Sequence, residues 1–440
     1  MKHVAPEFCY SSKKMTEQIE CLNHKNNQGG IMAIQPIFDD YTGITRVRTC
    51  TLMVTHACNL NCTYCYEEFK GDRYMDQNLA VSIVQKELAL VECSDKFEAL
   101  QIDFMGGEPL MNFPLIKYVV EWVESHPPKV PFVFFATTNG TLLTPEMKAW
   151  FREHKENIWL GASCDGTESM QNANRGTTKK EIDYDFFKQT WPLQSVHMTI
   201  SKATLPILAQ GVLFLQRERN FRVEAALAQG VEWSREDAEL YREQLWRLGE
   251  EYVRDPNIPP INLLGQTLAI EIPSTDGKPN LQKKFCGTGT HMVTYDIDGR
   301  KYGCHLFTPV VLGDVRAELD KFEWENGDLY NDSRCDNCVL RQTCPTCAGF
   351  NFKYRGAIAK RDMRGCLMAL ARAISVCEFQ IRLIADRRDS DMSHEDAVKA
   401  QKAMEAYEIL SKLDFPNVDA PFTIGNSRIV GNPRKGGEKQ

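Results

Sequence analysis

The sequence predicts an α/β fold in which a partial (β/α)6 barrel of the TIM type precedes a small cysteine-rich domain with a β-hairpin and C-terminal helices. Two observations support this prediction. Between residues 49 and 227, six apolar or β-branched runs alternate with amphipathic segments, which implies parallel strands joined by right-handed crossovers. Beyond about residue 275 the cysteines become dense and the apolar periodicity weakens, as expected of a small domain stabilised by metal clusters.

Composition narrows the class of protein. The chain has 440 residues, 43% of them apolar and 25% charged, enough to bury a core in two or more domains. The net charge of −7 argues against nucleic acid or an anionic membrane as a partner. The start of the chain lacks a signal-like apolar stretch, and no run of about 18 apolar residues occurs, so we expect a cytoplasmic protein. In that compartment, 16 cysteines indicate metal or redox chemistry rather than disulfides.

The first 275 residues contain an extension and the expected barrel. Residues 1–45 show no periodicity and are expected to form an N-terminal extension, and residues 46–275 form the barrel. A helix is expected from Asp76, which can cap it, to Val91, and another from Ser234, where Asp237 approximates a capping box. The six expected strands are Thr49–Thr55, Leu100–Met105, Pro131–Thr137, Ile158–Cys164, Val196–Ile200 and Phe221–Leu227.

A hairpin opens the expected C-terminal domain, residues 276–385. Its strands would be His291–Ile297 and Arg300–Phe307, with Asp298 and Gly299 supplying the positive φ angles of a tight turn. Two helices are expected to follow, Cys366–Leu383 and His394–Leu413. Residues 386–440 would comprise the second helix and a disordered tail.

Three cysteines follow the first expected strand, at the end of the barrel where catalytic groups gather. Cys58, Cys62 and Cys65 can hold three irons of a 4Fe-4S cluster and leave the fourth iron open. An open coordination position is what a catalytic metal site needs. The alternatives are a chance grouping and a zinc site, for which His56 is the nearest fourth ligand.

The spacing of these cysteines, with Tyr64 directly before the last, resembles that of the radical SAM superfamily. The resemblance implies that Tyr64 packs near the adenine of S-adenosylmethionine (SAM). It also implies that the methionyl amine and carboxylate chelate the open iron. An electron from the cluster would then cleave the sulfonium and give a 5′-deoxyadenosyl radical.

Other strand ends carry further similarity to the family. Gly106, Gly107, Glu108 and Pro109 follow the second expected strand and resemble the motif that meets the methionyl amine. Two glycines at a strand end also allow close approach to a ligand, although the same residues can form a simple turn. The resemblance also implies that residues at later strand ends contact the ribose or a carboxylate. Ordinary turn chemistry is the alternative explanation for these residues. The candidates are Thr138, Asn139, Ser163, Asp165 and Arg175.

Seven more cysteines lie in the last third of the chain: Cys286, Cys304, Cys335, Cys338, Cys344, Cys347 and Cys366. A zinc ribbon could use the tetrad of Cys335, Cys338, Cys344 and Cys347. The layout resembles the SPASM extension of radical SAM enzymes, with two auxiliary 4Fe-4S clusters, except that two residues rather than three separate Cys344 from Cys347. The family's crossed connectivity implies an outer cluster on Cys335, Cys338, Cys344 and Cys366. The inner cluster would use Cys286, Cys304 and Cys347, with an open iron or a further ligand, giving three clusters in all.

SPASM-bearing enzymes include sulfatase maturases and enzymes that modify ribosomally synthesised peptides. Sulfatase maturases carry a catalytic aspartate after the hairpin cysteine, whereas this chain has His305. His305 is our first candidate for the base and a packed histidine the alternative, with Tyr295, Asp296 and Asp298 ranking lower. We therefore expect a radical SAM oxidoreductase that forms a C–C, C–S or C–O bond in a peptide or protein. The alternatives are an anaerobic sulfatase maturase, which forms formylglycine, and a zinc-stabilised interaction protein.

The expected partners follow from this function. The substrate would be a peptide or protein, and the reducing electron would come from a flavodoxin or ferredoxin. About 45 residues before the barrel are too few for a winged-helix recognition domain, so leader recognition would need a separate protein or another surface of this chain.

Overall fold

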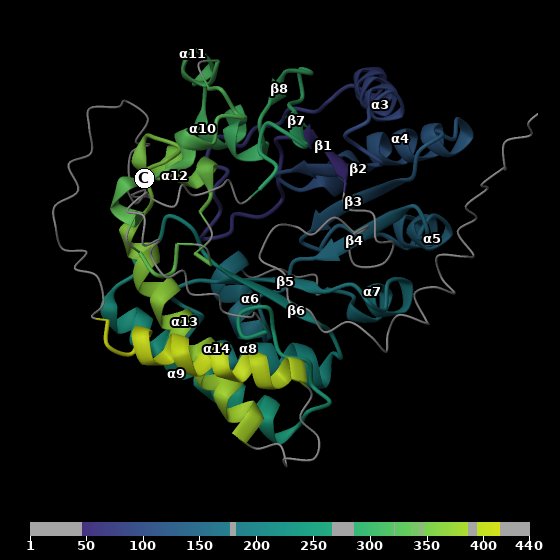
Figure 1. The fold of residues 1–440 in the computed structure, drawn as a ribbon. Coiled ribbons are helices and arrows are strands. Elements are labelled where there is room, and N and C mark those ends of the chain that lie inside the picture. The colour runs from purple at the N-terminus through teal and green to yellow at the C-terminus, as the bar shows by residue number, and fades with distance from the viewer. Residues whose placement is uncertain are drawn as a thin grey trace, which may run out of the picture.

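The computed structural model describes residues 46–176, 182–265, 286–320, 322–336, 338–341, 343–344, 346–385 and 394–413. The expected N-terminal extension and C-terminal tail lie outside these residues. Figure 1 shows a mostly parallel sheet with helices beside it and further helices below. The expectation of an α/β fold is therefore confirmed.

All six strands expected before residue 275 are present. They are β1 (Val47–Thr55), β2 (Ala99–Gly106), β3 (Phe132–Thr138), β4 (Ile158–Ala162), β5 (Val196–Ile200) and β6 (Val223–Leu227). Strands β1 to β4 pair in parallel in the order β4-β3-β2-β1, while β5 and β6 form a second parallel pair. An isolated bridge between Ser163 and His197 joins the end of β4 to β5.

The cysteine-rich region completes the larger sheet, which the sequence did not predict. Strand β7 (Met292–Tyr295) pairs in parallel with the free edge of β1, and β8 (Lys301–Tyr302) pairs antiparallel with β7. The hairpin strands are shorter than expected. Gly299 has a φ of +77°, but Asp298 does not have a positive φ, so the expected turn with two such residues is wrong.

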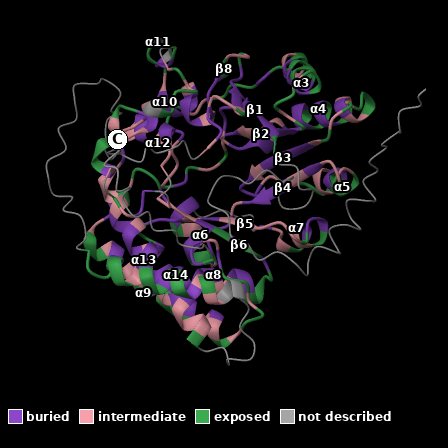
Figure 2. Ribbon diagram, viewed as in Figure 1, coloured by how far each residue is buried: buried purple, intermediate pink, exposed green. Residues whose placement is uncertain are grey.

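Helices cover the outer face of the sheets. They are α3 (Gln77–Glu92), α4 (Phe113–Ser125), α5 (Pro145–Glu153), α6 (Glu168–Arg175), α7 (Tyr184–Thr190), α8 (Leu208–Leu213) and α9 (Arg235–Arg254). Asp76 caps α3 through the amides of Asn78 and Leu79, and Ser234 forms a capping box with Asp237, as expected. Alternate residues of the strands, such as Ile102 and Phe104, pack with these helices in the main core (Figure 2).

The C-terminal region has its own apolar cluster, in which Phe307 and Phe352 pack with Met53 of β1. Its helices are α10 (Pro309–Leu312), α11 (Arg316–Leu319), α12 (Ala348–Arg355), α13 (Met363–Ala385) and α14 (His394–Leu410). Helix α13 packs between α9 and α14 (Figure 1). The aromatic side chains of this cluster therefore contribute buried apolar area to the region in which metal clusters are expected.

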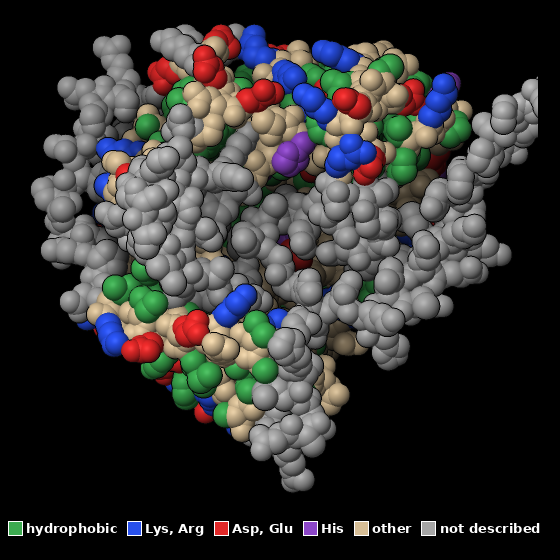
Figure 3. Space-filling model, viewed as in Figure 1, with side chains coloured by type: hydrophobic (Ala, Val, Ile, Leu, Met, Phe, Trp, Pro, Cys, Tyr) green, Lys and Arg blue, Asp and Glu red, His purple; other side chains and the backbone are tan. Residues whose placement is uncertain are grey.

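The described surface shown in Figure 3 mixes Lys and Arg side chains with Asp and Glu rather than separating the two signs. Within the described residues, no helix is long and apolar enough to cross a membrane.

Candidate functional site

The three-cysteine loop begins at the carboxyl end of β1. Cys62 is buried, and Cys58 and Cys65 are half-buried. The amide of Cys65 donates to the carbonyl of Cys62 at 3.1 Å, which forms a tight turn. The amide of Thr63 donates to the carbonyl of Asn174 in α6 at 2.8 Å, so the middle of the loop is fixed to the opposite side of the site.

The chemistry of the three thiols suits a metal group. Burial raises the pKa of Cys62 to about 11, against the opposing charge of Arg175, and the neighbouring thiols of Cys65 and Cys58 raise it further. These thiols must therefore lose protons when they bind a metal. No group of three or more His, Cys, Asp or Glu side chains in the described part of the chain converges closely enough to hold a single ion. In a 4Fe-4S cluster each thiolate binds a different iron, so the thiols can lie farther apart than the ligands of a single ion.

His56 does not support the zinc alternative. Its Nε2 lies 2.6 Å from Oδ1 of Asp296, and both side chains are buried. This pair connects the end of β1 to the end of β7.

Gly106 and Gly107 allow the backbone of β2 to approach the cysteine loop. A Cβ atom at Gly106 would lie 2.2 Å from the carbonyl oxygen of Thr55. At Gly107 it would lie 2.3 Å from the carbonyl oxygen of Ala57 and 2.8 Å from Cβ of Cys58. The glycines thus make close contact with the loop itself, in addition to any contact that they make with a ligand.

Glu108 lies directly behind this contact and is almost completely buried. Its Oε1 accepts hydrogen bonds from Thr138 Oγ1 at 2.7 Å and the amide of Leu110 at 3.2 Å, and its Oε2 accepts from the amide of Asn139 at 2.8 Å. Burial raises the pKa of Glu108, and these donors oppose the rise. With one hydrogen bond on Oε2, the carboxylate retains capacity for another donor. Pro109 begins the short turn Pro109–Asn112.

A chain of amides joins the cysteine loop to the end of β3. Nδ2 of Asn139 donates to Oδ1 of Asn59 at 2.9 Å, and Nδ2 of Asn59 donates to Oγ1 of Thr141 at 2.8 Å. Thr138 and Asn139, expected as ligand contacts, therefore also orient Glu108 and the loop. Sequence reasoning missed Asn59, although its place directly after Cys58 could have identified it.

Asp165 holds the aromatic residue of the cysteine motif in place. Its carboxylate accepts hydrogen bonds from Tyr64 Oη at 2.7 Å and from Nε and Nη2 of Arg175 at 2.9 and 3.0 Å. It also accepts from the side chain of Asn174 and the amide of Thr199. The guanidinium of Arg175 lies 5.6 Å from the centre of the Tyr64 ring.

These five hydrogen bonds fill the acceptor positions of the buried Asp165 carboxylate. Asp165 thus holds the side chains of Tyr64 and Arg175 in place. This role does not favour the direct contact with ribose that is expected for Asp165. Ser163 is half-buried at the end of β4, with its amide bonded to the carbonyl of Thr138.

The seven C-terminal cysteines fall into two groups of interacting thiols. Burial raises the pKa of Cys366 to about 12, and the thiols of Cys344, Cys335 and Cys338 raise it further. Burial likewise raises the pKa of Cys304, with contributions from Cys347 and Cys286. Cys347 therefore lies with Cys286 and Cys304, a division that does not favour the zinc-ribbon tetrad.

The candidate bases occupy very different environments. Tyr295 is buried, and its hydroxyl donates to Oε1 of Glu87 in α3 at 2.6 Å, while Asp296 is paired with His56. Asp298 is exposed, and its carboxylate accepts from the amide of Arg300 in the hairpin turn. The structure does not support a role as base for these three residues, because each is committed to packing or to a turn.

His305 lies beside the cysteine loop. Its ring centre is 6.0 Å from that of Tyr66, the residue that follows Cys65, and burial lowers the pKa of His305 to about 4. The imidazole is therefore neutral near pH 7 and can accept a proton, but it is a weak base.

Two residues beside the loop were missed by sequence reasoning. The ring of Tyr66 also packs edge-on against Phe350, three residues after Cys347, so it lies between the loop and the C-terminal region. Glu67 is buried, and burial raises its pKa to about 7 while Lys70 opposes the rise. Their positions directly after Cys65 were the available signal.

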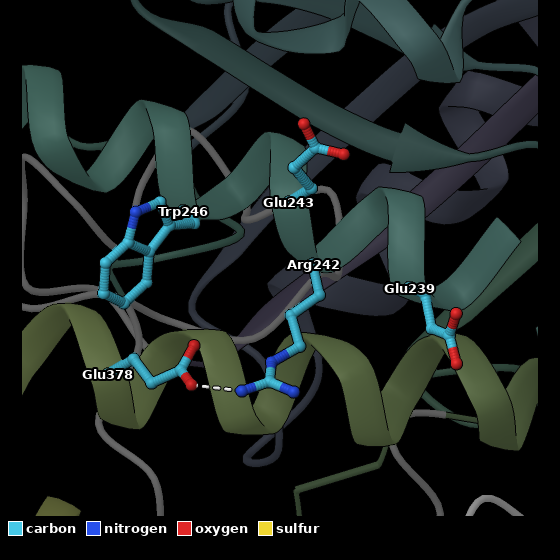
Figure 4. Close-up of a pocket in the computed structure, with 5 residues that line it drawn as sticks. All are labelled: Glu239, Arg242, Glu243, Trp246 and Glu378. Atoms are coloured by element: carbon cyan, nitrogen blue, oxygen red, sulfur yellow. Dashed lines mark hydrogen bonds and ion pairs between the residues drawn. The ribbon is translucent and has the colours of Figure 1, made fainter. Parts of the chain in front are cut away.

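A surface pocket between α9 and α13 lies outside this site (Figure 4). Arg242 pairs there with Glu378, while Glu239 and Glu243 pair with other arginines of α9. The pocket contains none of the cysteines, and its charges are already compensated.

The first part of the chain is similar to known iron-sulfur proteins. A model described as a 4Fe-4S single cluster domain matches residues 43–170. The radical SAM cyclopropyl synthase TigE of Paramaledivibacter caminithermalis is 23% identical over 149 residues, 29% of this chain and 31% of that enzyme. The first part of this chain is therefore similar to a 4Fe-4S cluster domain and to a radical SAM enzyme.

Two solved structures show that the likeness in fold extends into the C-terminal region. SAM-bound anSMEcpe superposes with a TM-score of 0.51 and 17% identity, covering 81% of this chain and 99% of anSMEcpe. Streptococcus suis SuiB, bound to its precursor peptide SuiA, gives a TM-score of 0.50 at 13% identity, covering 80% and 87%. At these identities the likeness is one of fold. The chain spans less than two thirds of the length of the curated relatives that it matches.

Proposed function

We propose that this protein is a radical SAM enzyme, which binds a 4Fe-4S cluster through Cys58, Cys62 and Cys65 and uses SAM to modify a peptide or protein oxidatively. The observation that carries the proposal is the contact of Gly107 with the cysteine loop at the end of β1, beside which the amide of Glu108 donates to the carbonyl of Ala57 at 2.9 Å. When bound, the cluster supplies the electron that cleaves SAM to a 5′-deoxyadenosyl radical.

Protein residues would hold SAM on two sides. Glu108 is fixed by donors from the end of β3 and retains an acceptor position for the methionyl amine. Tyr64 is restrained by its hydrogen bond to Asp165 and by the guanidinium of Arg175, so its ring is already oriented for the adenine. Such preorganisation reduces the entropy lost on binding.

The two groups of C-terminal thiols would hold the auxiliary clusters. Cys335, Cys338, Cys344 and Cys366 supply four ligands for the outer cluster, and Cys286, Cys304 and Cys347 supply three for the inner one. Because β7 joins β1, the barrel of residues 46–275 and the cluster domain of residues 276–385 would act as one unit.

A peptide substrate is proposed from the likeness to SuiB, which is bound to a precursor peptide. His305 is neutral and beside the cysteine loop, so it remains the candidate base. The reaction would remove hydrogen from an unactivated carbon and form a C–C, C–S or C–O bond. A flavodoxin or ferredoxin would supply the reducing electron, and a separate protein would present the leader.

The test is anaerobic purification followed by iron and sulfide analysis and a SAM-cleavage assay. Three 4Fe-4S clusters require about twelve irons per chain, whereas the zinc alternative requires almost none. Reduced protein given SAM should release 5′-deoxyadenosine, and its absence would refute the proposal. Replacement of Cys58, Cys62 and Cys65 by Ala should abolish cleavage while the auxiliary absorbance remains.

His305 has its own test. His305→Ala should still cleave SAM but leave the substrate peptide unmodified, whereas full product formation would remove His305 from the mechanism.

Sulfatase maturation is the second candidate, favoured by the fold shared with anSMEcpe. Incubation with a sulfatase-derived peptide separates the two candidates, because only a maturase would convert its target residue to formylglycine. His305 at the position of the maturases' aspartate argues against that result.

A further inference from the structure

Arg361 carries buried hydrogen-bond donors that the protein does not satisfy. Its side chain is 5% exposed, and Nε and Nη2 have no hydrogen-bond partner among the described residues. The third nitrogen, Nη1, donates to the carbonyl of Cys344 at a long 3.4 Å. Buried guanidinium groups are almost always paired, so two unused nitrogens indicate a missing acceptor.

The backbone of Arg361 is fixed by two hydrogen bonds. The amide of Arg361 donates to Oδ2 of Asp332 at 2.9 Å, and its carbonyl accepts from Nη2 of Arg334 at 2.8 Å. The carboxylate of Asp332 is itself engaged by the guanidinium of Arg334. Asp332 thus bonds Arg334 and the backbone of Arg361, while Nε and Nη2 of Arg361 remain without a hydrogen-bond partner among the described residues.

The surroundings of Arg361 are cysteines of the proposed outer cluster. Nη1 of Arg361 donates to the carbonyl of Cys344, and its amide donates to the side chain of Asp332, whose carbonyl accepts from the amide of Cys335 at 2.8 Å. Neutral thiols are weak acceptors, whereas thiolates and inorganic sulfides carry negative charge and accept strongly. The planar fork of a guanidinium suits two such acceptors side by side.

We propose that Nε and Nη2 of Arg361 donate hydrogen bonds to sulfur atoms of the outer 4Fe-4S cluster and favour its reduced state. This inference rests on the proposed function. Bound there, the cluster would take up one electron from the substrate radical, which would be oxidised by one electron, and would pass that electron to an acceptor of the flavodoxin or ferredoxin class. Arg361 would stabilise the negative charge that the cluster carries in between. Hydrogen bonds to cluster sulfurs are an established means of setting the reduction potential.

The test is a potentiometric titration of the reconstituted full chain, followed by electron paramagnetic resonance. Replacing Cys58, Cys62 and Cys65 by Ala first removes the SAM-binding cluster, so that two auxiliary signals remain. In that background, Arg361→Gln should lower one midpoint potential. The expected change is at least tenfold in the ratio of reduced to oxidised cluster at fixed solution potential, about 59 mV for a one-electron couple.

Arg364→Gln is the matched control. Arg364 lies two residues from Cys366, but its Nη1 donates to Glu232 at 2.9 Å and the side chain is partly exposed. It should leave both potentials unchanged. Arg361→Lys keeps the charge but loses the fork, and a smaller shift in the same direction is expected.

The outcomes distinguish a failure of the proposed function from a failure of the proposed role of Arg361. Absence of auxiliary signals before any arginine is changed would refute the proposed function. If both signals are present, unchanged potentials in Arg361→Gln, or an equal shift in Arg364→Gln, would refute the role of Arg361 alone. If Arg361→Gln fails to fold, unchanged potentials in Arg361→Lys would have the same meaning.

Discussion

Replacing Gly107 by Ala should disable SAM cleavage, because the new methyl group would collide with the cysteine loop. The added Cβ would lie 2.3 Å from the carbonyl oxygen of Ala57, where contacts below 3.0 Å are essentially never found. The backbones must therefore separate by at least about 0.7 Å, and neither atom belongs to a flexible side chain. A misplacement of about 1 Å at a catalytic site can cost about 10²-fold in rate. We expect a loss of that order in 5′-deoxyadenosine formation.

The assay compares Gly107→Ala with Gly71→Ala in anaerobically reconstituted protein. Gly71 lies just beyond the same loop, and a Cβ there would meet no atom within 4 Å. In the Gly71→Ala control, the iron content and the rate of SAM cleavage should both stay unchanged. In Gly107→Ala the rate of SAM cleavage should fall, with or without a loss of iron. Cleavage at the wild-type rate in Gly107→Ala would show that the close contact does not position the loop.

Three further substitutions test the assignments around the site. Tyr295→Phe should preserve product formation but reduce stability by about 1–3 kcal/mol in a thermal melt, because Glu87 loses a buried hydrogen bond. Asp165→Asn should cost about 3–5 kcal/mol, seen as loss of soluble protein, because it leaves the buried charge of Arg175 without its partner; normal yield and activity would contradict this. Burial raises the pKa of Asp103 to about 7, above the value in an unfolded chain. The stability gained from its proton is thus present at low pH and lost as the pH rises towards 7, by up to about 1.4 kcal/mol per unit. Asp103→Asn should flatten the fall in melting temperature between about pH 5 and pH 7, and an identical slope would contradict the raised pKa.

Local signals in the sequence predicted most elements before residue 275. The six strands were visible because apolar runs of strand length alternate with amphipathic segments, and Asp76 and Ser234 cap the helices that their side chains predicted. These features depend on neighbouring residues alone. The pairing of β7 with β1 was not predictable in this way, because more than 200 residues separate the two strands and no local pattern encodes the partner.

The candidate site likewise contains some features that the sequence predicts and others that it does not. The three cysteines of the loop and the glycine pair are recognisable from their spacing, and the structure brings Gly107 into contact with Cys58. The environment of a polar side chain does not follow from spacing. Tyr295 and Asp296 are neighbours in the sequence, yet Tyr295 points to helix α3 and Asp296 to His56. Alternation along a strand separates the two side chains, and only the packed structure identifies their partners.

The parallel pairing of β7 with β1 has a consequence for biosynthesis. Strand β1 emerges early from the ribosome and can pair with β2, but its other edge stays open until residues 292–295 have been made. Nascent chains would carry an unprotected strand edge through much of translation, which is a hazard for aggregation. A version truncated near residue 275 would keep that edge permanently. Removal of the cysteine-rich region would therefore expose the edge of β1, a strand in the middle of the sheet.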